Sequence, residues 1–171
     1  LYAERLDHPG SPTLLIYGHL DVQPVDPLEQ WEHPPFQAHE VDGKLYGRGA
    51  ADDKGQTLIH LKACEAWLKI HGKLPLNIKF IIEGEEEIGS PNFKELVDAH
   101  QGKLASDVVV ISDTAMVAKG YPTISYATRG LVYLQIDITG PQIDLHSGSF
   151  GGAVVNPAKA LVDLLSSMVD E

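Results

Sequence analysis

The sequence predicts an α/β protein with a mostly parallel sheet flanked by helices. Apolar strand-like runs alternate with helical patterns from residue 14 to about residue 113. This alternation is typical of parallel strands joined by right-handed helical crossovers. After residue 129 the pattern changes to a half-exposed strand, a glycine-rich loop and a helix. These two observations indicate one α/β domain followed by part of another.

The first expected strand covers residues 14–17, where four apolar residues lead into a glycine. The preceding residues 1–13 are charged and end in a loop rich in proline and glycine. After the strand, the pair Asp42 and Gly43 lies between strand-like residues. An Asp-Gly pair in this context is a strong signal for a tight hairpin turn.

A helix is expected between Gly55 and Gly72, because apolar residues recur there at helical spacing and Gly72 supplies a stop. Cys64 lies on the apolar face of this helix, which favours a buried structural thiol over a nucleophile. As the sole cysteine of the chain, it excludes an internal disulfide and fits a reducing compartment. We therefore expect a cytoplasmic protein.

Two further strands are expected at residues 76–82 and 107–111. The first alternates apolar residues on one face, whereas the second is a nearly continuous apolar run, as in a buried parallel strand. Between them, Ser90 followed by Pro91 is typical of a helix start, and we expect that helix to continue to about His100.

The last part of the chain alternates apolar and polar residues at 132–138, which suits a half-exposed strand. Asn156 and Pro157 then predict the start of a helix. A single strand and a single helix cannot bury both of their faces. We therefore expect a first domain at residues 1–128 and the opening of a second at residues 129–171.

The charge of the chain argues against some classes of partner. Its net charge is −11, from 13 basic and 24 acidic residues. Such a surplus disfavours nucleic acid and anionic membrane surfaces as partners. No run approaches the ~20 apolar residues of a membrane-spanning helix. Clustered acids would instead suit a cation, although a solvated acidic surface explains most of the surplus.

Polar residues gather where the expected strands end. They are His19 and Asp21, the pair Asp52 and Asp53 in a glycine-rich turn, Glu85 to Glu87, and Asp113. The carboxyl ends of parallel strands meet at one edge of a sheet, where functional clefts lie. Crowded carboxylates repel one another unless a cation lies among them. Each signal alone also has a structural explanation, as a turn, a helix cap or a solvated face.

Histidine and carboxylates without a useful cysteine favour Zn, Mn or Co over a thiolate-bound structural ion. The surplus of carboxylates suggests two ions, about 3.5–4 Å apart. A carboxylate two residues after a ligating histidine can fix the tautomer of the ring. A glutamate beside a ligating glutamate can act as the general base that takes a proton from water.

Five motifs in order give the chain a resemblance to a known family: YGHLDVQPV, GRGAADDKG, EGEEEIGS, ISD and DLHSGSFGG. From about residue 14 onward, the chain is similar to the dinuclear-zinc metallopeptidases. This family includes carnosine-type dipeptidases, glutamate carboxypeptidases, aminoacylases and succinyl-diaminopimelate desuccinylases. EGEEEIGS and DLHSG look closest to the dipeptidase branch. The resemblance implies a zinc-exopeptidase-type sheet, followed by the first strand and helix of an α+β lid that forms a homodimer.

The resemblance also implies a ligand set for two divalent ions, with zinc as the first choice and Mn or Co as alternatives. His19 and Asp113 would bind the first ion, and Glu87 the second. Asp52 would bridge both ions, and the family places a cis peptide bond after it, here before Asp53.

For catalysis, the resemblance implies Glu86 as the general base and Asp21 as the residue that holds the His19 ring. His146, in the lid, would reach into the active site of the partner subunit and stabilise the oxyanion of the tetrahedral intermediate. The substrate would be a small peptide or an N-acyl amino acid.

The chain departs from the family at its end. A second-metal histidine and the groups that hold the substrate carboxylate are expected beyond Glu171, and none of His8, His60, His71 and His100 matches that motif. Three interpretations follow. The first is a metal-dependent dipeptidase, and the second is an N-acyl or N-succinyl amino-acid amidohydrolase. The third is an incomplete fragment that acts only in binding, and we expect weak or absent activity from the isolated 171 residues.

Overall fold

The computed structural model describes residues 1–169 and divides the chain into two compact units, Leu1–Ile124 and Ser125–Glu171. The strands of the first unit are β1 (Tyr2–Arg5), β2 (Thr13–His19), β3 (His39–Val41), β4 (Lys44–Tyr46), β5 (Asn77–Glu83) and β6 (Val108–Ile111). Its helices are α1 (Lys54–His71), α2 (Phe93–Ala99) and α3 (Gln101–Leu104), with short 3-10 turns η1 (Leu28–Gln30) and η2 (Glu86–Ile88). No helix among the described residues has the length and apolarity needed to cross a membrane.

The main sheet has four strands in the order β1-β5-β2-β6. β2 lies parallel to both β5 and β6, and only β1 is antiparallel, to β5. The predicted class, an α/β protein with a mostly parallel sheet, is therefore confirmed. The sequence analysis placed no strand in the charged residues before the loop, yet β1 forms there. This short charged segment becomes a strand because its backbone pairs with the free edge of β5, a contact that no local pattern indicates.

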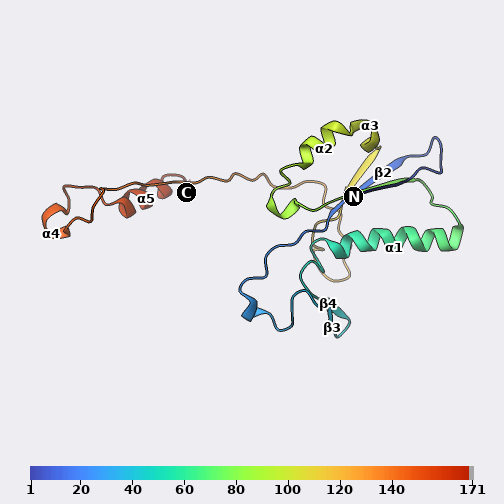
Figure 1. Ribbon diagram of the computed structural model, residues 1–171, viewed down its shortest axis with the longest axis horizontal. Coiled ribbons are helices and arrows are strands. Elements are labelled where there is room, and N and C mark those ends of the chain that lie inside the picture. The colour runs from blue at the N-terminus through green and yellow to red at the C-terminus, as the bar shows by residue number, and fades with distance from the viewer. Residues whose placement is uncertain (170–171) are drawn as a thin grey trace. The chain divides into compact units, whose positions relative to one another are not determined.

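Helices cover both faces of the sheet, as Figure 1 shows. One core cluster contains Ile16, Leu74, Ile78 and Phe80, with Leu68 and Cys64 of α1 packed against it. The other contains Leu15, Ile81 and Leu104, with Phe93 and Val97 of α2. Cys64 is half-buried, as the sequence suggested, and burial raises the pKa of its thiol.

Because β5 has helices on both sides, the first five of its residues are buried in succession. The sequence indicated instead one apolar face on this strand. The alternating pattern puts Lys79 on the face opposite the apolar residues, yet this lysine is buried, with 7% of its surface exposed. Its ammonium donates to the carbonyl oxygens of Lys103 and Ala105, each at 2.7 Å. These bonds compensate for the burial of a charge, which would otherwise be costly.

α1 ends as predicted at Gly72, which has a left-handed φ of 73° and donates its N–H to the Leu68 carbonyl at 2.8 Å. The predicted start of α2 was wrong, because Asn92 and not Ser90 is its N-cap. Ser90 has a φ of 51°. Its hydroxyl bonds to the Glu83 carboxylate at 2.9 Å, so it belongs to the preceding turn.

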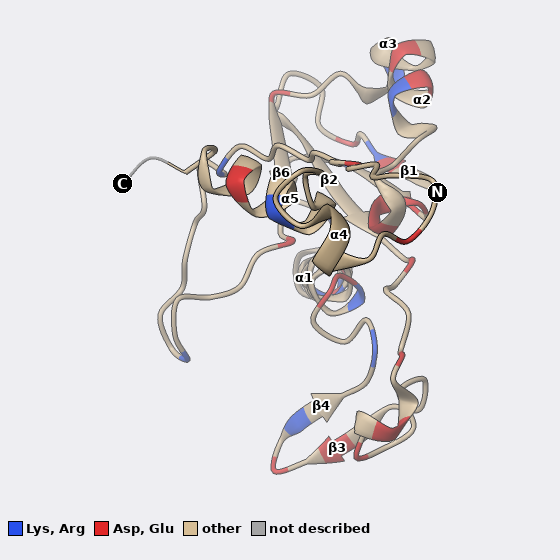
Figure 2. Ribbon diagram, turned by 90° about the vertical axis from the view of Figure 1, so that its left-hand side faces the viewer, with Lys and Arg blue, Asp and Glu red and all other residues tan. Residues whose placement is uncertain are grey.

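The predicted hairpin forms, with positive φ at Asp42 (51°) and Gly43 (71°), as a tight two-residue turn requires. It joins the acidic β3 to β4, which carries a lysine (Figure 2). β6 forms where a strand was expected but is largely exposed. The expectation of a fully buried strand was wrong here because, among the strands of residues 1–169, β6 lies at the edge of the sheet and has β2 as its single neighbour.

The second unit contains α4 (Ser147–Phe150) and α5 (Pro157–Ser166). α5 begins as predicted: the Asn156 side chain accepts a hydrogen bond from the Ala158 N–H at 2.9 Å, and Pro157 occupies the first turn. The strand expected at residues 132–138 is not formed. No described strand pairs with this segment, and a lone strand leaves its backbone groups without partners.

Candidate metal centre

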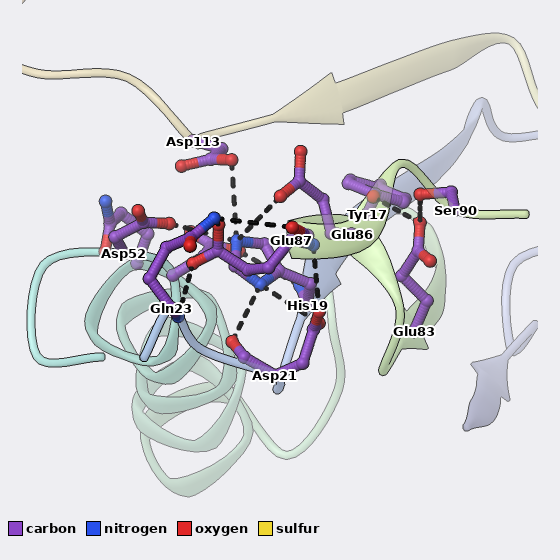
Figure 3. Close-up of polar contacts among 12 residues, drawn as sticks. Tyr17, His19, Asp21, Gln23, Asp52, Glu83, Glu86, Glu87, Ser90 and Asp113 are labelled. Atoms are coloured by element: carbon purple, nitrogen blue, oxygen red, sulfur yellow. Dashed lines mark hydrogen bonds and ion pairs between the residues drawn. The ribbon is translucent and has the colours of Figure 1, made fainter. Parts of the chain in front are cut away.

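Four segments of the first unit converge at the carboxyl edge of the parallel strands (Figure 3). β2 ends at His19, which lies in register with Glu83 at the end of β5. The η2 turn follows β5 directly, and Asp113 follows β6, the other parallel neighbour of β2. The turn before α1 contributes Asp52. Parallel pairing of β2 with β5 and β6, together with the turn before α1, thus brings the predicted residues of the first unit to a common edge.

The imidazole of His19 is completely buried and lies at the centre of this edge. Its Nδ1 is 3.1 Å from the carbonyl oxygen of Asp21 and 3.3 Å from the carboxylate Oδ1 of the same residue. Its Nε2 is 3.0 Å from Oδ1 of Asp52, 3.6 Å from Oδ2 of Asp113 and 4.0 Å from Oε2 of Glu86. One ring nitrogen therefore faces Asp21, and the other faces three carboxylates.

This donor set fits a divalent cation. A neutral imidazole that donates Nδ1–H to the Asp21 carbonyl must present a lone pair at Nε2. That lone pair would face anionic oxygens, so a proton or a metal cation must lie among them. Donor atoms of His19, Asp52 and Asp113 lie within 4.8 Å of one another, as ligands of one ion require. Imidazole with carboxylates suits Zn, Mn or Co.

The pKa values at the edge reflect this crowding of like charges. Burial raises the pKa of Glu86 above its ordinary value, and the charges of Asp113 and Glu87 add to the effect. Burial likewise raises the pKa of Asp113, with Asp52 as the main additional cause. Burial lowers the pKa of His19, but its bond to the Asp21 carbonyl and the nearby carboxylates outweigh this, so the pKa is raised. A divalent cation would relieve the repulsion.

The pKa of Asp21 shifts in the opposite direction. Burial alone would raise its pKa, but hydrogen bonds from backbone N–H groups, first that of Glu87 at 2.9 Å, lower it below the ordinary value. Its carboxylate therefore stays ionised beside the His19 ring. An ionised carboxylate at this place helps to orient the ring and increases its basicity.

The turn before α1 brings Asp52 to the site. The peptide bond between Asp52 and Asp53 is cis, as the resemblance implied. Asp53 is 1% exposed, and its Oδ2 accepts from the His19 N–H at 3.3 Å and from the Thr57 hydroxyl at 3.1 Å. The backbone of the predicted histidine ligand is thereby tied to the first turn of α1.

Asp21 and Glu86 contact the His19 ring from outside the three-residue cluster, and Glu87 and His146 make other contacts. The Glu87 carboxylate is held by Gln23, whose backbone N–H bonds to Oε1 at 3.1 Å and whose side-chain amide bonds to Oε2 at 2.6 Å. His146 belongs to the second unit, where it is the N-cap of α4 and its Nδ1 accepts from the Gly148 N–H at 3.0 Å. The role of His146 thus stays a prediction.

Two residues at the edge were missed by the sequence reasoning. Gln23 is in the same turn as Asp21, which is the only signal that could have indicated it. His60 of α1 has its Nε2 2.6 Å from the hydroxyl of Ser112, directly before Asp113. Its position on a helix gave no sign that it faces the end of a strand 52 residues later.

An α/β sheet with histidine and carboxylates at its carboxyl edge is the arrangement of a metal-dependent enzyme. Comparison with known proteins identifies the class more closely. The sequence profile of peptidase family M20/M25/M40 matches residues 15–171. The chain belongs to this family, which confirms the resemblance seen in the five motifs.

Two of the curated relatives that the chain matches are named as dipeptidases. The chain is 45% identical over 172 residues to human Beta-Ala-His dipeptidase and covers 99% of itself but 34% of that protein. It is 42% identical to the Cys-Gly metallodipeptidase of Candida albicans over 95% of the chain and 34% of the relative. The chain therefore spans about a third of the length of the curated relatives it matches.

Two solved structures of peptidases are similar to this chain in sequence and in fold. Human carnosine dipeptidase 1 matches with 42% identity and a TM-score of 0.70, over 99% of this chain and 36% of that one. An M20 family metallo-carboxypeptidase from Sulfolobus solfataricus matches with 35% identity and a TM-score of 0.77, over 99% and 38% of the two chains. These likenesses support the α/β fold and the metallopeptidase class.

Proposed function

We propose that the full-length protein containing this chain hydrolyses the peptide bond of dipeptides or short peptides in a metal-dependent reaction. The observation that carries the proposal is the convergence of Asp52, Asp113 and Glu86 on the Nε2 of His19, within 3.0 to 4.0 Å. Relatives named Beta-Ala-His and Cys-Gly dipeptidases support the choice of substrate class.

Two divalent ions would be held at this edge, with zinc favoured by the donor set and Mn or Co as alternatives. His19, Asp52 and Asp113 would hold the first ion, and Asp52 with Glu87 the second. When bound, the ions supply Lewis acidity, which polarises the scissile carbonyl and makes water a better nucleophile at neutral pH.

Glu86 is the proposed general base. Its carboxylate would accept a proton from the attacking water and return it to the leaving amine. Its Oε2 lies 4.0 Å from Nε2 of His19, so the carboxylate is at the edge where the ions and the attacking water would be held. Asp21 would hold the His19 ring in the tautomer that leaves Nε2 free.

The Glu86→Gln variant of the full-length protein tests this role. The amide keeps the shape of the side chain but cannot accept the proton, so turnover should fall by about 10²–10⁴-fold. Bound metal, measured by mass spectrometry of the purified variant, should stay at the wild-type amount.

Glu85→Gln is the matched control, because Glu85 precedes Glu86 and its carboxylate bonds to Asn92 at 2.9 and 3.0 Å instead of facing the site. This control should keep wild-type turnover. Retained turnover in Glu86→Gln would disprove the assigned role. Rates measured on dipeptides, longer peptides and N-acyl amino acids would separate a dipeptidase from an amidohydrolase.

We also propose that the intact protein is a cytoplasmic homodimer formed through the lid. In such a dimer, His146 of one subunit would stabilise the developing oxyanion in the site of its partner. If so, mixing a His146→Ala variant with a Glu86→Gln variant should restore activity in the mixed dimers. Failure of two inactive variants to complement each other would count against a shared site.

A further inference from the structure

The turn after β2 and the η2 turn after β5 are joined through Gln23, which has no part in the proposed chemistry (Figure 3). Its backbone N–H donates to Oε1 of Glu87 at 3.1 Å, and its side-chain amide donates to Oε2 at 2.6 Å. The same amide nitrogen lies 3.3 Å from the Glu87 carbonyl oxygen. One residue, 64 positions away in the chain, therefore holds both oxygens of the Glu87 carboxylate.

The backbone of Glu87 is held as well. Its N–H donates to Oδ2 of Asp21 at 2.9 Å. The other oxygen of Asp21 lies 3.3 Å from Nδ1 of His19. A continuous path of contacts thus connects the imidazole proposed for the first ion with the carboxylate proposed for the second.

The hydrogen bonds from Gln23 are compatible with metal binding by Glu87. Each carboxylate oxygen has two lone pairs, so it can accept an N–H and still face a cation. Among residues 1–169, the neighbouring Glu86 receives no hydrogen bond on its carboxylate that would restrain it in the same way.

We propose that Gln23 is a positioning residue that holds the Glu87 carboxylate in place as a ligand of the second ion. This inference rests on the proposed two-ion site. Residues that orient metal ligands typically change metal affinity by about 10–100-fold when they are replaced. Because Gln23 bonds to Glu87, its loss should lower the affinity for the second ion. The affinity for the ion held by His19, Asp52 and Asp113 should stay unchanged.

The test uses the full-length protein, stripped of metal and titrated with zinc in buffers of defined free concentration. Gln23→Leu and Gln23→Met both remove the amide, and methionine keeps the length of the side chain. Gln101→Leu, at an exposed position on α3, is the matched control. The measurements are zinc bound per chain, the affinity of each ion, and the melting temperature of the metal-stripped protein.

For both Gln23 variants, we expect one ion with wild-type affinity and one weakened by about 10–100-fold. The melting temperature of the stripped protein should barely change, because Gln23 is exposed. Gln101→Leu should match wild type. The proposal would be overturned if the Gln23 variants kept wild-type affinity for both ions, or if they lost affinity for both ions equally. It would also be overturned if the wild-type protein bound a single ion. A wild-type protein that binds two ions without hydrolysing dipeptides would refute the proposed function and leave the Gln23 test intact.

Discussion

At the scale of single residues, the site depends on how closely β2 approaches α1. Gly18 lies directly before His19, and a Cβ at this position would be 2.2 Å from Oγ1 of Thr57 and 2.8 Å from Oδ2 of Asp53. Both atoms belong to the network that holds the His19 N–H. A side chain at position 18 would therefore separate β2 from the first turn of α1.

Gly18→Ala should lower the free energy of unfolding by about 1–3 kcal/mol, the usual cost of overpacking. It should also weaken zinc binding, because the His19 backbone shifts away from Asp53. Urea unfolding and zinc titration measure the two effects. Gly84→Ala is the control, since a Cβ there meets nothing within 4 Å. Equal stability of the two variants would contradict the account of a close approach.

The sequence indicated His19, Asp21, Asp52, Glu86 and Asp113 because chemically distinctive residues followed strand ends. Gln23 and His60 were missed for a physical reason. A glutamine in a turn and a histidine on a helix have no local pattern that shows what they face. Their bonds, to Glu87 and Ser112, span 64 and 52 residues of chain.

At the scale of elements, α1 illustrates a boundary that local chemistry decides. Gly72 adopts a φ of 73°, and its N–H closes the last turn on Leu68. A left-handed residue costs little for glycine and more for any residue with a Cβ. The stop at Gly72 was predictable for this reason.

Gly72→Ala should destabilise the protein by about 1 kcal/mol, because alanine must adopt the left-handed conformation. Gly102→Ala provides the comparison, since this residue lies within α3 and a Cβ there meets nothing within 4 Å. Its change in unfolding free energy should be close to zero or stabilising. Thermal and urea unfolding of both variants would show the difference, and a stabilised Gly72→Ala protein would contradict it.

Local patterns are not sufficient to predict the structure of three segments: β1, β6 and residues 132–138. β1 forms because β5 offers a free edge, and β6 is exposed because it pairs on one side only. Residues 132–138 alternate as a strand should, yet no described strand pairs with them. Strand formation depends on backbone partners that the sequence does not name.

At the scale of the whole molecule, metal binding should contribute to stability. His19, Asp52 and Asp113 come from different segments, after β2, before α1 and after β6, so an ion that binds them links these segments in the folded state only. Zinc at about 100 times its dissociation constant should stabilise the fold by about 2.7 kcal/mol. A chelator should lower the melting temperature of the full-length protein, and zinc should restore it.

His19→Ala removes the central donor and should abolish most of the zinc-dependent shift in melting temperature. The control is His71→Ala, at the end of α1 and exposed. A protein whose melting temperature does not respond to chelator or zinc would count against the metal centre. The same outcome would leave the fold assignment unaffected.

The sequence by itself determined the α/β class, the hairpin, the ends of α1 and the start of α5, because these depend on periodicity, turn residues and caps. It also indicated the family and the residue types of the site. The tertiary structure alone decided which residues meet: the pairing of β1 with β5, the burial of Lys79, and the contacts of Gln23 and His60. Contacts between segments dozens of residues apart depend on how the sheet and helices pack, and local patterns carry no information about that packing.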